Sequence, residues 1–194
     1  MPVPVLALCL LLGASPVAPA PELLALKEKL AKTTSLQATF VQKRHWAALK
    51  DPLVTEGSFS FRKPDQIRWK TLPPNESELI LNGKRAQIRY PALGTEQEFD
   101  LGADPGMASV FDSILAVLQA DVDRLAPFYD LTIVKKSPLQ LELKPRSEQV
   151  AKVVRRIELG FDAQLFLTHV VLHESGGDWT EIAFRDHVAN GKGR

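Results

Sequence analysis

One stretch, residues 57–69, constrains the fold more than any other part of this chain. It reads GSFSFRKPDQIRW, and its two phenylalanines alternate with serines at the period of two that is typical of a half-buried strand. Pro64 interrupts the run, because proline has no amide hydrogen to donate to a ladder. Ile67 and Trp69 then alternate with basic residues. The stretch therefore predicts a β-hairpin with an aromatic face.

A basic cluster surrounds the turn of this hairpin and consists of Arg62, Lys63 and Arg68. Two interpretations follow from the local pattern. In the first, the hairpin belongs to an ordinary β core and its basic tip is solvated. In the second, the hairpin forms one wall of an apolar cavity and the cations lie at its mouth. The stretch alone does not distinguish them, because periodicity is the same for a solid and a hollow sheet.

Alternation of the same kind recurs through most of the chain, with turn residues between the runs. The short connections favour antiparallel neighbours, because parallel pairs need long crossovers. Asn82-Gly83 separates two such runs, and both residues accept the positive φ of a type I′ turn. About ten strands are predicted, at residues 36–45, 54–61, 67–70, 78–81, 85–90, 129–134, 139–144, 153–161, 165–174 and 179–185, with a further short strand at residues 96–101.

Two segments change to a helical period. Residues 21–34 repeat leucine at spacings of three and four and begin with Pro21, which suits a first turn, so they predict an amphipathic helix over one face of the sheet. Residues 104–120 predict a longer helix that must lie across the sheet. The apolar stripe of this longer helix, its lid face, comprises Met107, Val110, Phe111, Ile114, Leu115 and Leu118.

The first 20 of the 194 residues differ from the rest, because they contain no charged side chain and include an apolar run followed by small residues and prolines. They predict a cleaved secretory signal, too short to span a membrane. The single cysteine, Cys9, lies within it, so a mature chain would lack thiol chemistry and disulfides. We expect one mainly β domain over residues 21–189 and a frayed polar tail at 190–194.

The residues give no sign of catalysis, a cofactor or a nucleic-acid partner. The formal net charge is +1, whereas nucleic-acid-binding domains are usually strongly basic. No nucleophile elbow or phosphate-binding glycine loop is present. His169 and His173 share one strand face, but residues four apart on a strand are separated by about 13 Å, too far to ligate one metal ion. We therefore expect neither an enzyme nor a metal site.

A series of short motifs runs in a fixed order along the chain. It comprises Leu36-x-Ala38-x-Phe40-x-Gln42, Glu56-Gly57, Arg62-Lys63-Pro64, Arg68-Trp69, Pro74, Leu79-Ile80, Asn82-Gly83, Tyr90-Pro91 and, more weakly, Leu143-Lys144-Pro145, Ile157-x-Leu159-x-Phe161 and Gly177-Asp178-x-Thr180-x-Ile182-x-Phe184. This series resembles the periplasmic outer-membrane lipoprotein carrier family, the LolA-like proteins. It covers nearly all of the expected mature chain, and the specific signal is the order of the motifs.

The resemblance implies an unclosed, strongly curved antiparallel β-barrel whose helices cover an apolar cavity for the acyl chains of lipoproteins. It implies a basic latch that holds the lid shut, and Lys63 occupies that position beside Arg62. The cavity wall would comprise Phe40, Phe59, Phe61, Ile67, Trp69 and Leu79.

The resemblance further implies a monomeric periplasmic carrier without a cofactor. Its partners would be an acylated lipoprotein or another lipid, an inner-membrane donor complex and an outer-membrane acceptor. The chain ends soon after Asp186, whereas carriers of the main pathway usually continue, which leaves open a divergent branch that serves another lipid or lipid-linked product. The alternative function is a sensor domain of the same fold that binds a lipid or a protein and transports nothing.

Overall fold

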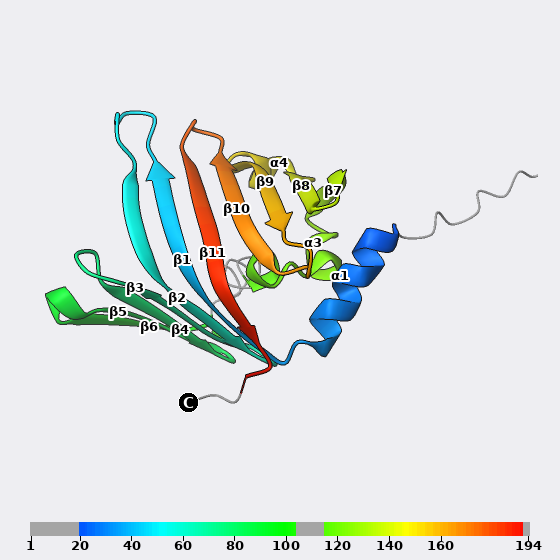
Figure 1. Ribbon diagram of the computed structural model, residues 1–194. Helices are drawn as coiled ribbons and strands as arrows, with labels where there is room; N and C mark the ends of the chain where they lie inside the picture. Colours follow the sequence, from blue (N-terminus) through cyan, green and yellow to red (C-terminus); the bar gives the residue numbers. More distant parts are fainter. Residues whose placement is uncertain (1–19, 104–114, 192–194) are drawn as a thin grey trace, which may run out of the picture.

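The computed structural model describes residues 20–103 and 115–191, and within them one curved antiparallel sheet of eleven strands dominates (Figure 1). The strands are β1 (Ser35–His45), β2 (Leu53–Arg62), β3 (Gln66–Thr71), β4 (Ser77–Asn82), β5 (Arg85–Tyr90), β6 (Thr95–Asp100), β7 (Tyr129–Lys136), β8 (Leu139–Pro145), β9 (Val154–Phe161), β10 (Leu167–Glu174) and β11 (Trp179–Ala189). This confirms the mainly β, unclosed and strongly curved sheet expected above.

The strand order joins the two ends of the chain at the middle of the sheet. It runs β6-β5-β4-β3-β2-β1-β11-β10-β9-β8-β7, so β1 pairs with both β2 and β11. The first six strands form one wing and the last five form the other. Each wing ends in a strand, β6 or β7, that has one strand neighbour among the described residues, so the sheet stays open.

Alternation along the strands separates an apolar inner face from a polar outer face. On β2 and β3 the cross-strand pairs Phe59–Trp69 and Phe61–Ile67 point to the inner face, whereas Ser60 and Arg68 point outward. The inner residues belong to a continuous buried core that extends over both wings. The aromatic face predicted for residues 57–69 is therefore part of this inner face.

Gly57 permits the sheet to pack tightly at the centre of this face. It pairs with Phe40 across β1 and β2. A Cβ added at Gly57 would lie 1.9 Å from the Lys70 carbonyl oxygen and 2.6 Å from the nearest Phe40 ring carbon, so no other residue fits without movement. The glycine thus lets the Phe40 ring lie flat over the backbone of β2.

Helix α1 (Pro21–Lys32) covers part of the inner face (Figure 1). Pro21 and Glu22 occupy its first turn, and Lys29 and Lys32 its last, an arrangement that complements the helix dipole. Its apolar stripe turns toward the sheet, and Leu26 is fully buried there. The predicted amphipathic helix over the sheet is confirmed.

Smaller elements were not predicted from the sequence. They are α3 (Val122–Leu125), α4 (Glu148–Ala151) and the 3-10 turn η1 (Pro91–Leu93). The turn expected at Asn82-Gly83 is shifted by one residue, because Asn82 pairs with Arg85 as the last residue of β4. Gly83 provides the only positive φ in this turn, +59°, so the prediction that Asn82 would share that role was wrong.

The predicted central helix lies partly outside the described residues. Residues 115–119 are helical, and Leu115 and Leu118 within them are buried in the core. Met107, Val110, Phe111 and Ile114 lie outside the described residues, as does the expected signal except for Ala20. None of the helices in the described parts is long and apolar enough to cross a membrane.

Substituting Gly57→Ala tests the packing at the centre of the sheet. Because the added methyl group meets the Lys70 carbonyl and the Phe40 ring, we expect a loss of about 3 kcal/mol of stability, or about 10 °C in the melting temperature. Thermal unfolding followed by circular dichroism measures this shift. Gly176→Ala is the control, since nothing lies within 4 Å of a Cβ there. Equal melting temperatures for the two variants would contradict the packing described.

Candidate functional site

Four aromatic rings form the floor of the inner face where the two wings meet. Phe40 stacks on Trp69 with ring centroids 4.0 Å apart, and Phe184 of β11 meets both rings edge-on at 6.4 Å and 6.0 Å. Phe59 lies 5.9 Å from Trp69 in the same edge-on manner. Such geometries are favourable beyond simple area burial. The floor is therefore closely packed, and it connects β1, β2, β3 and β11.

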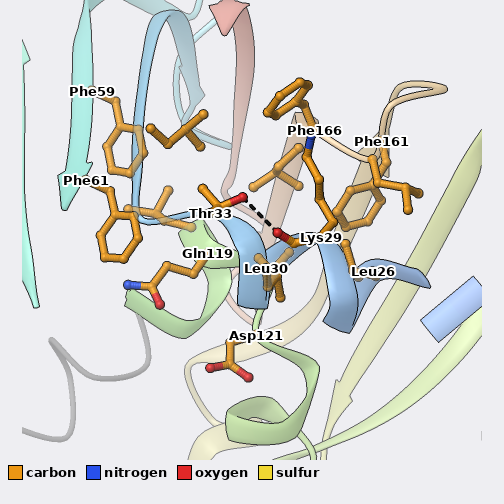
Figure 2. Close-up of a pocket in the computed structure, with 15 residues that line it drawn as sticks. Leu26, Lys29, Leu30, Thr33, Phe59, Phe61, Gln119, Asp121, Phe161 and Phe166 are labelled. Atoms are coloured by element: carbon orange, nitrogen blue, oxygen red, sulfur yellow. Dashed lines mark hydrogen bonds between the residues drawn. The ribbon is translucent and has the colours of Figure 1, made fainter. Parts of the chain in front are cut away.

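A first cavity of about 60 Å³ lies between α1 and the sheet (Figure 2). It has room for about two water molecules, and its walls are mainly apolar. Helix α1 and both wings contribute to it. Its lining includes Leu26, Leu30, Phe59, Phe61, Leu118, Phe161, Leu165, Phe166 and Leu167, with Lys29, Thr33, Gln119 and Asp121 at polar positions.

A second cavity of about 250 Å³ lies over the β3–β4 part of the inner face. Its lining consists of Gln42, Ile67, Trp69, Leu79, Leu81, Leu115, Leu118 and Ile182. Leu118 lines both cavities, so one leucine of the segment 115–119 stands between them. The two cavities therefore have mainly apolar walls and are separated by the Leu118 side chain.

The structure divides the six predicted wall residues between these features. Phe59 and Phe61 line the first cavity, and Ile67, Trp69 and Leu79 line the second. Phe40 lines neither, because it lies 2 % exposed beneath Trp69 in the aromatic floor. Of the predicted lid face, the structure brings Leu115 and Leu118 to these cavities, and the other four residues lie outside the described part.

Several cavity residues were not identified from the sequence. Leu26 and Leu30 come from α1, which had been predicted only as a covering helix. Gln42, Phe161, Leu167 and Ile182 come from strands that had been predicted without a role in the site. The alternation of these strands carried the necessary signal, but it does not reveal which residues of distant strands meet.

The basic cluster of the β2–β3 turn separates into three environments. The Lys63 ammonium group donates to the backbone oxygens of Leu30 and Ala31, at 2.9 Å and 3.1 Å, at the C-terminal end of α1. Arg68 donates from Nε to the carboxylate of Glu78 on the outer face. The Arg62 side chain makes no hydrogen bond or ion pair with any described residue. Lys63 thus joins the β2–β3 turn to α1. Arg62 and Arg68 lie on the outer face of the sheet, away from the cavities.

Two ion pairs hold α1 at its first turn and at its middle. Lys136 Nζ lies 3.4 Å from Glu22 Oε1 and Lys27 Nζ lies 2.6 Å from Asp123 Oδ1. A backbone hydrogen bond at the helix start holds the pKa of Glu22 below its ordinary value, against desolvation and with help from Lys136. All these contacts lie at the surface, so α1 is secured by apolar burial beneath and weak polar contacts around.

Asn190 forms hydrogen bonds at the junction of α1 and β1. Its side-chain amide donates to the Lys32 carbonyl oxygen at 2.9 Å and accepts from the Thr34 amide at 2.7 Å. This residue is the first of the tail that was expected to fray, and residues 192–194 lie outside the described part. The end of β11 is thereby tied to the end of α1.

The chemistry available in this site is that of apolar binding. Among residues 20–103 and 115–191, no three histidine, cysteine, aspartate or glutamate side chains are grouped closely enough to hold a metal ion. His173 instead contacts Glu158 at 2.9 Å, and His169 lies 3.6 Å from Glu181, both on the outer face. Gln42 is the polar lining residue of the second cavity, and Lys29, Thr33, Gln119 and Asp121 are those of the first, among walls that are otherwise hydrocarbon.

Known sequences identify the family. The family model described as "Outer membrane lipoprotein carrier protein LolA" matches residues 31–193. An outer-membrane lipoprotein carrier protein of Francisella philomiragia is 26 % identical over 159 residues, which cover 81 % of this chain and 73 % of the relative. One of Shewanella sediminis is 26 % identical over 185 residues, which cover 95 % and 84 %.

Solved structures support the fold independently. The Mycobacterium tuberculosis lipoprotein LppX is similar with a TM-score of 0.51 at 11 % identity, over 89 % of this chain and 95 % of that one. The Pseudomonas aeruginosa MucA/MucB complex contains a chain that is similar with a TM-score of 0.51 at 20 % identity. The match covers 89 % of this chain and 57 % of that one. Family match, ordered motifs and curved open sheet agree, and the chain belongs to the outer-membrane lipoprotein carrier (LolA) family.

Proposed function

We propose that this protein is a periplasmic carrier that shields the acyl chains of a lipoprotein or another lipid while it moves them from the inner to the outer membrane. The observation that carries the proposal is the pair of apolar cavities between α1, the segment 115–119 and the inner face of the sheet. Carriers that match the chain over most of its length support the direction of transport.

The energetic requirement for such a carrier is simple. Each CH₂ group exposed to water costs about 0.8 kcal/mol, so a long acyl chain faces a penalty on the order of 10 kcal/mol outside a membrane. Apolar walls remove this penalty without catalysis. The first cavity, about 60 Å³, is too small for such a chain, so loading requires α1 to move away from the sheet.

The contacts that hold α1 suit reversible opening. Surface ion pairs contribute about 0–1 kcal/mol each, and the Lys63 bonds end on the last carbonyl groups of the helix. We infer that Lys63 is the latch. Release at its end of α1 opens the first cavity beside the β2–β3 turn. The carrier acts as a monomer that receives cargo from an inner-membrane complex and delivers it to an outer-membrane acceptor.

Substituting Leu118→Trp tests whether the cavities hold acyl chains. The larger side chain occupies space that both cavities share, so we expect binding of a fluorescent fatty acid to weaken at least tenfold, with a loss of about 1–3 kcal/mol in stability from overpacking. Fluorescence titration measures the affinity. Leu93→Trp, at a position that is 73 % exposed, is the matched control and should bind like the parent protein.

The same titration separates the carrier from a domain that binds only a partner protein. Absence of saturable fatty-acid binding in the parent protein would contradict the carrier and favour the protein-binding alternative. Unchanged binding in Leu118→Trp, with the variant folded, would place the acyl chain outside these cavities.

Substituting Lys63→Met tests the latch. Loss of the two bonds to Leu30 and Ala31 should lower the free energy of opening of α1 by about 1 kcal/mol, after allowance for solvent exposure. Amide hydrogen exchange in residues 21–32 should then accelerate about fivefold. Lys63→Arg should restore protection, and Lys84→Met is the control. Acceleration spread evenly over α1 and the sheet would indicate general destabilisation and contradict a latch.

A further inference from the structure

A polar hollow of about 380 Å³ lies on the outer face of the sheet, at the end where α1 leads into β1. Strands β1, β2, β3 and β4 and the end of β11 contribute to it. The lining comprises Ser35, Gln37, Ser60, Phe61, Arg62, Gln66, Ile67, Arg68, Ile80, Leu81, Asn82, Val188 and Gly191. The cavities on the inner face account for none of its polar side chains.

Strand register places the two arginines of the hollow side by side. Arg62 pairs with Gln66 and Ser60 pairs with Arg68, so the arginines are diagonal neighbours on the same face. Diagonal Cβ atoms in an antiparallel pair lie about 7–8 Å apart. Two guanidinium groups on that spacing can reach one anion between them.

The charge balance of the hollow is positive. Its charged lining residues are the two arginines, and no carboxylate lines it. The guanidinium group of Arg62 makes no hydrogen bond or ion pair with a described residue. Arg68 donates from Nε to the Glu78 carboxylate, and its side chain is 61 % exposed. Glu78 also lies 3.9 Å from Arg89, so its charge is shared between two arginines.

The hollow borders both apolar cavities at the rim of the sheet. Phe61 lines the hollow and the first cavity, and Ile67 and Leu81 line the hollow and the second. Arg62 directly precedes Lys63, which holds the end of α1. A lipid whose chains enter beneath α1 at this rim would leave its polar end within reach of Arg62.

We propose that this hollow binds a phosphate-type anion, carried on the head group of the lipid whose acyl chains occupy the cavities. The proposal rests on the carrier function above and adds a chemical class to its cargo. Arginine suits the task, because its planar fork of donors matches phosphate oxygens in a bidentate manner and stays charged at every relevant pH. Gln37, Ser60 and Gln66 supply neutral donors around it.

The test compares three ligands by isothermal titration calorimetry. Dihexanoyl phosphatidic acid and dihexanoylglycerol carry the same acyl chains and differ by the phosphate, and inorganic phosphate carries no chain. The parent protein should bind the phosphatidic acid about tenfold more tightly than the glycerol. Arg62→Gln should remove that difference and leave the affinity for the glycerol unchanged.

Lys50→Gln is the matched control, because it removes one exposed positive charge from the β1–β2 loop, at the far end of both strands from the hollow. It should retain the full preference. Equal affinities for the two lipids in the parent protein, or a preference that survives Arg62→Gln, would overturn the proposal.

The inorganic-phosphate titration distinguishes the two sources of the anion. If inorganic phosphate binds as tightly as the phosphatidic acid and depends on Arg62, the site is one for free phosphate and the link to cargo is overturned. If neither lipid binds, the carrier function fails. In that case, weaker binding of inorganic phosphate to Arg62→Gln than to the parent protein would show that the hollow binds an anion, and equal binding would overturn the site as well.

Discussion

An open, apolar inner face that must be kept from water is the constraint on which the rest of this structure depends. The sheet bends but does not close, since β6 and β7 remain edges of the described sheet, and its inner side bears a row of aromatic and aliphatic residues. A sheet of this kind needs a cover. Helix α1 and the segment 115–119 provide it, and the spaces they leave are the two cavities.

The cover is held in two ways that differ in strength. Burial of Leu26 and its neighbours holds α1 by the hydrophobic effect, and Lys63, Lys27 and Glu22 add polar contacts at the surface. An acyl chain that enters the site presents the same kind of apolar surface to the sheet as α1 does. In the proposed carrier function, an acyl chain would therefore replace the helix without a large net cost, as loading and release would both require.

The aromatic floor joins the strands beneath the helix. Phe40, Trp69 and Phe184 lock three strands together, and Gly57 lets the Phe40 ring approach the backbone. Because the floor is closely packed and the polar contacts of α1 lie at the surface, the opening proposed for the carrier would involve the helix and not the sheet.

Period-two alternation placed Phe59, Phe61, Ile67 and Trp69 on one face of a hairpin, because strand geometry alone assigns such residues to one face. Their role as a cavity wall, and that of Leu79, came from the family resemblance. The sequence did not identify Leu26 as a cavity residue, because an amphipathic helix shows which stripe is buried and not what lies beneath it. Phe161 and Ile182 were missed because their place in the site depends on the pairing of β1 with β11, a contact between the two ends of the chain.

The direct test of an acyl-binding interior is nuclear magnetic resonance of methyl-labelled protein with a fatty acid that carries a nitroxide near its methyl end. We expect strong broadening of the methyl signals of Leu26 and Leu118, which line the first cavity, and none at the exposed Leu93 and Val153. Broadening confined to exposed leucines and valines, with sharp signals from Leu26 and Leu118, would contradict the account.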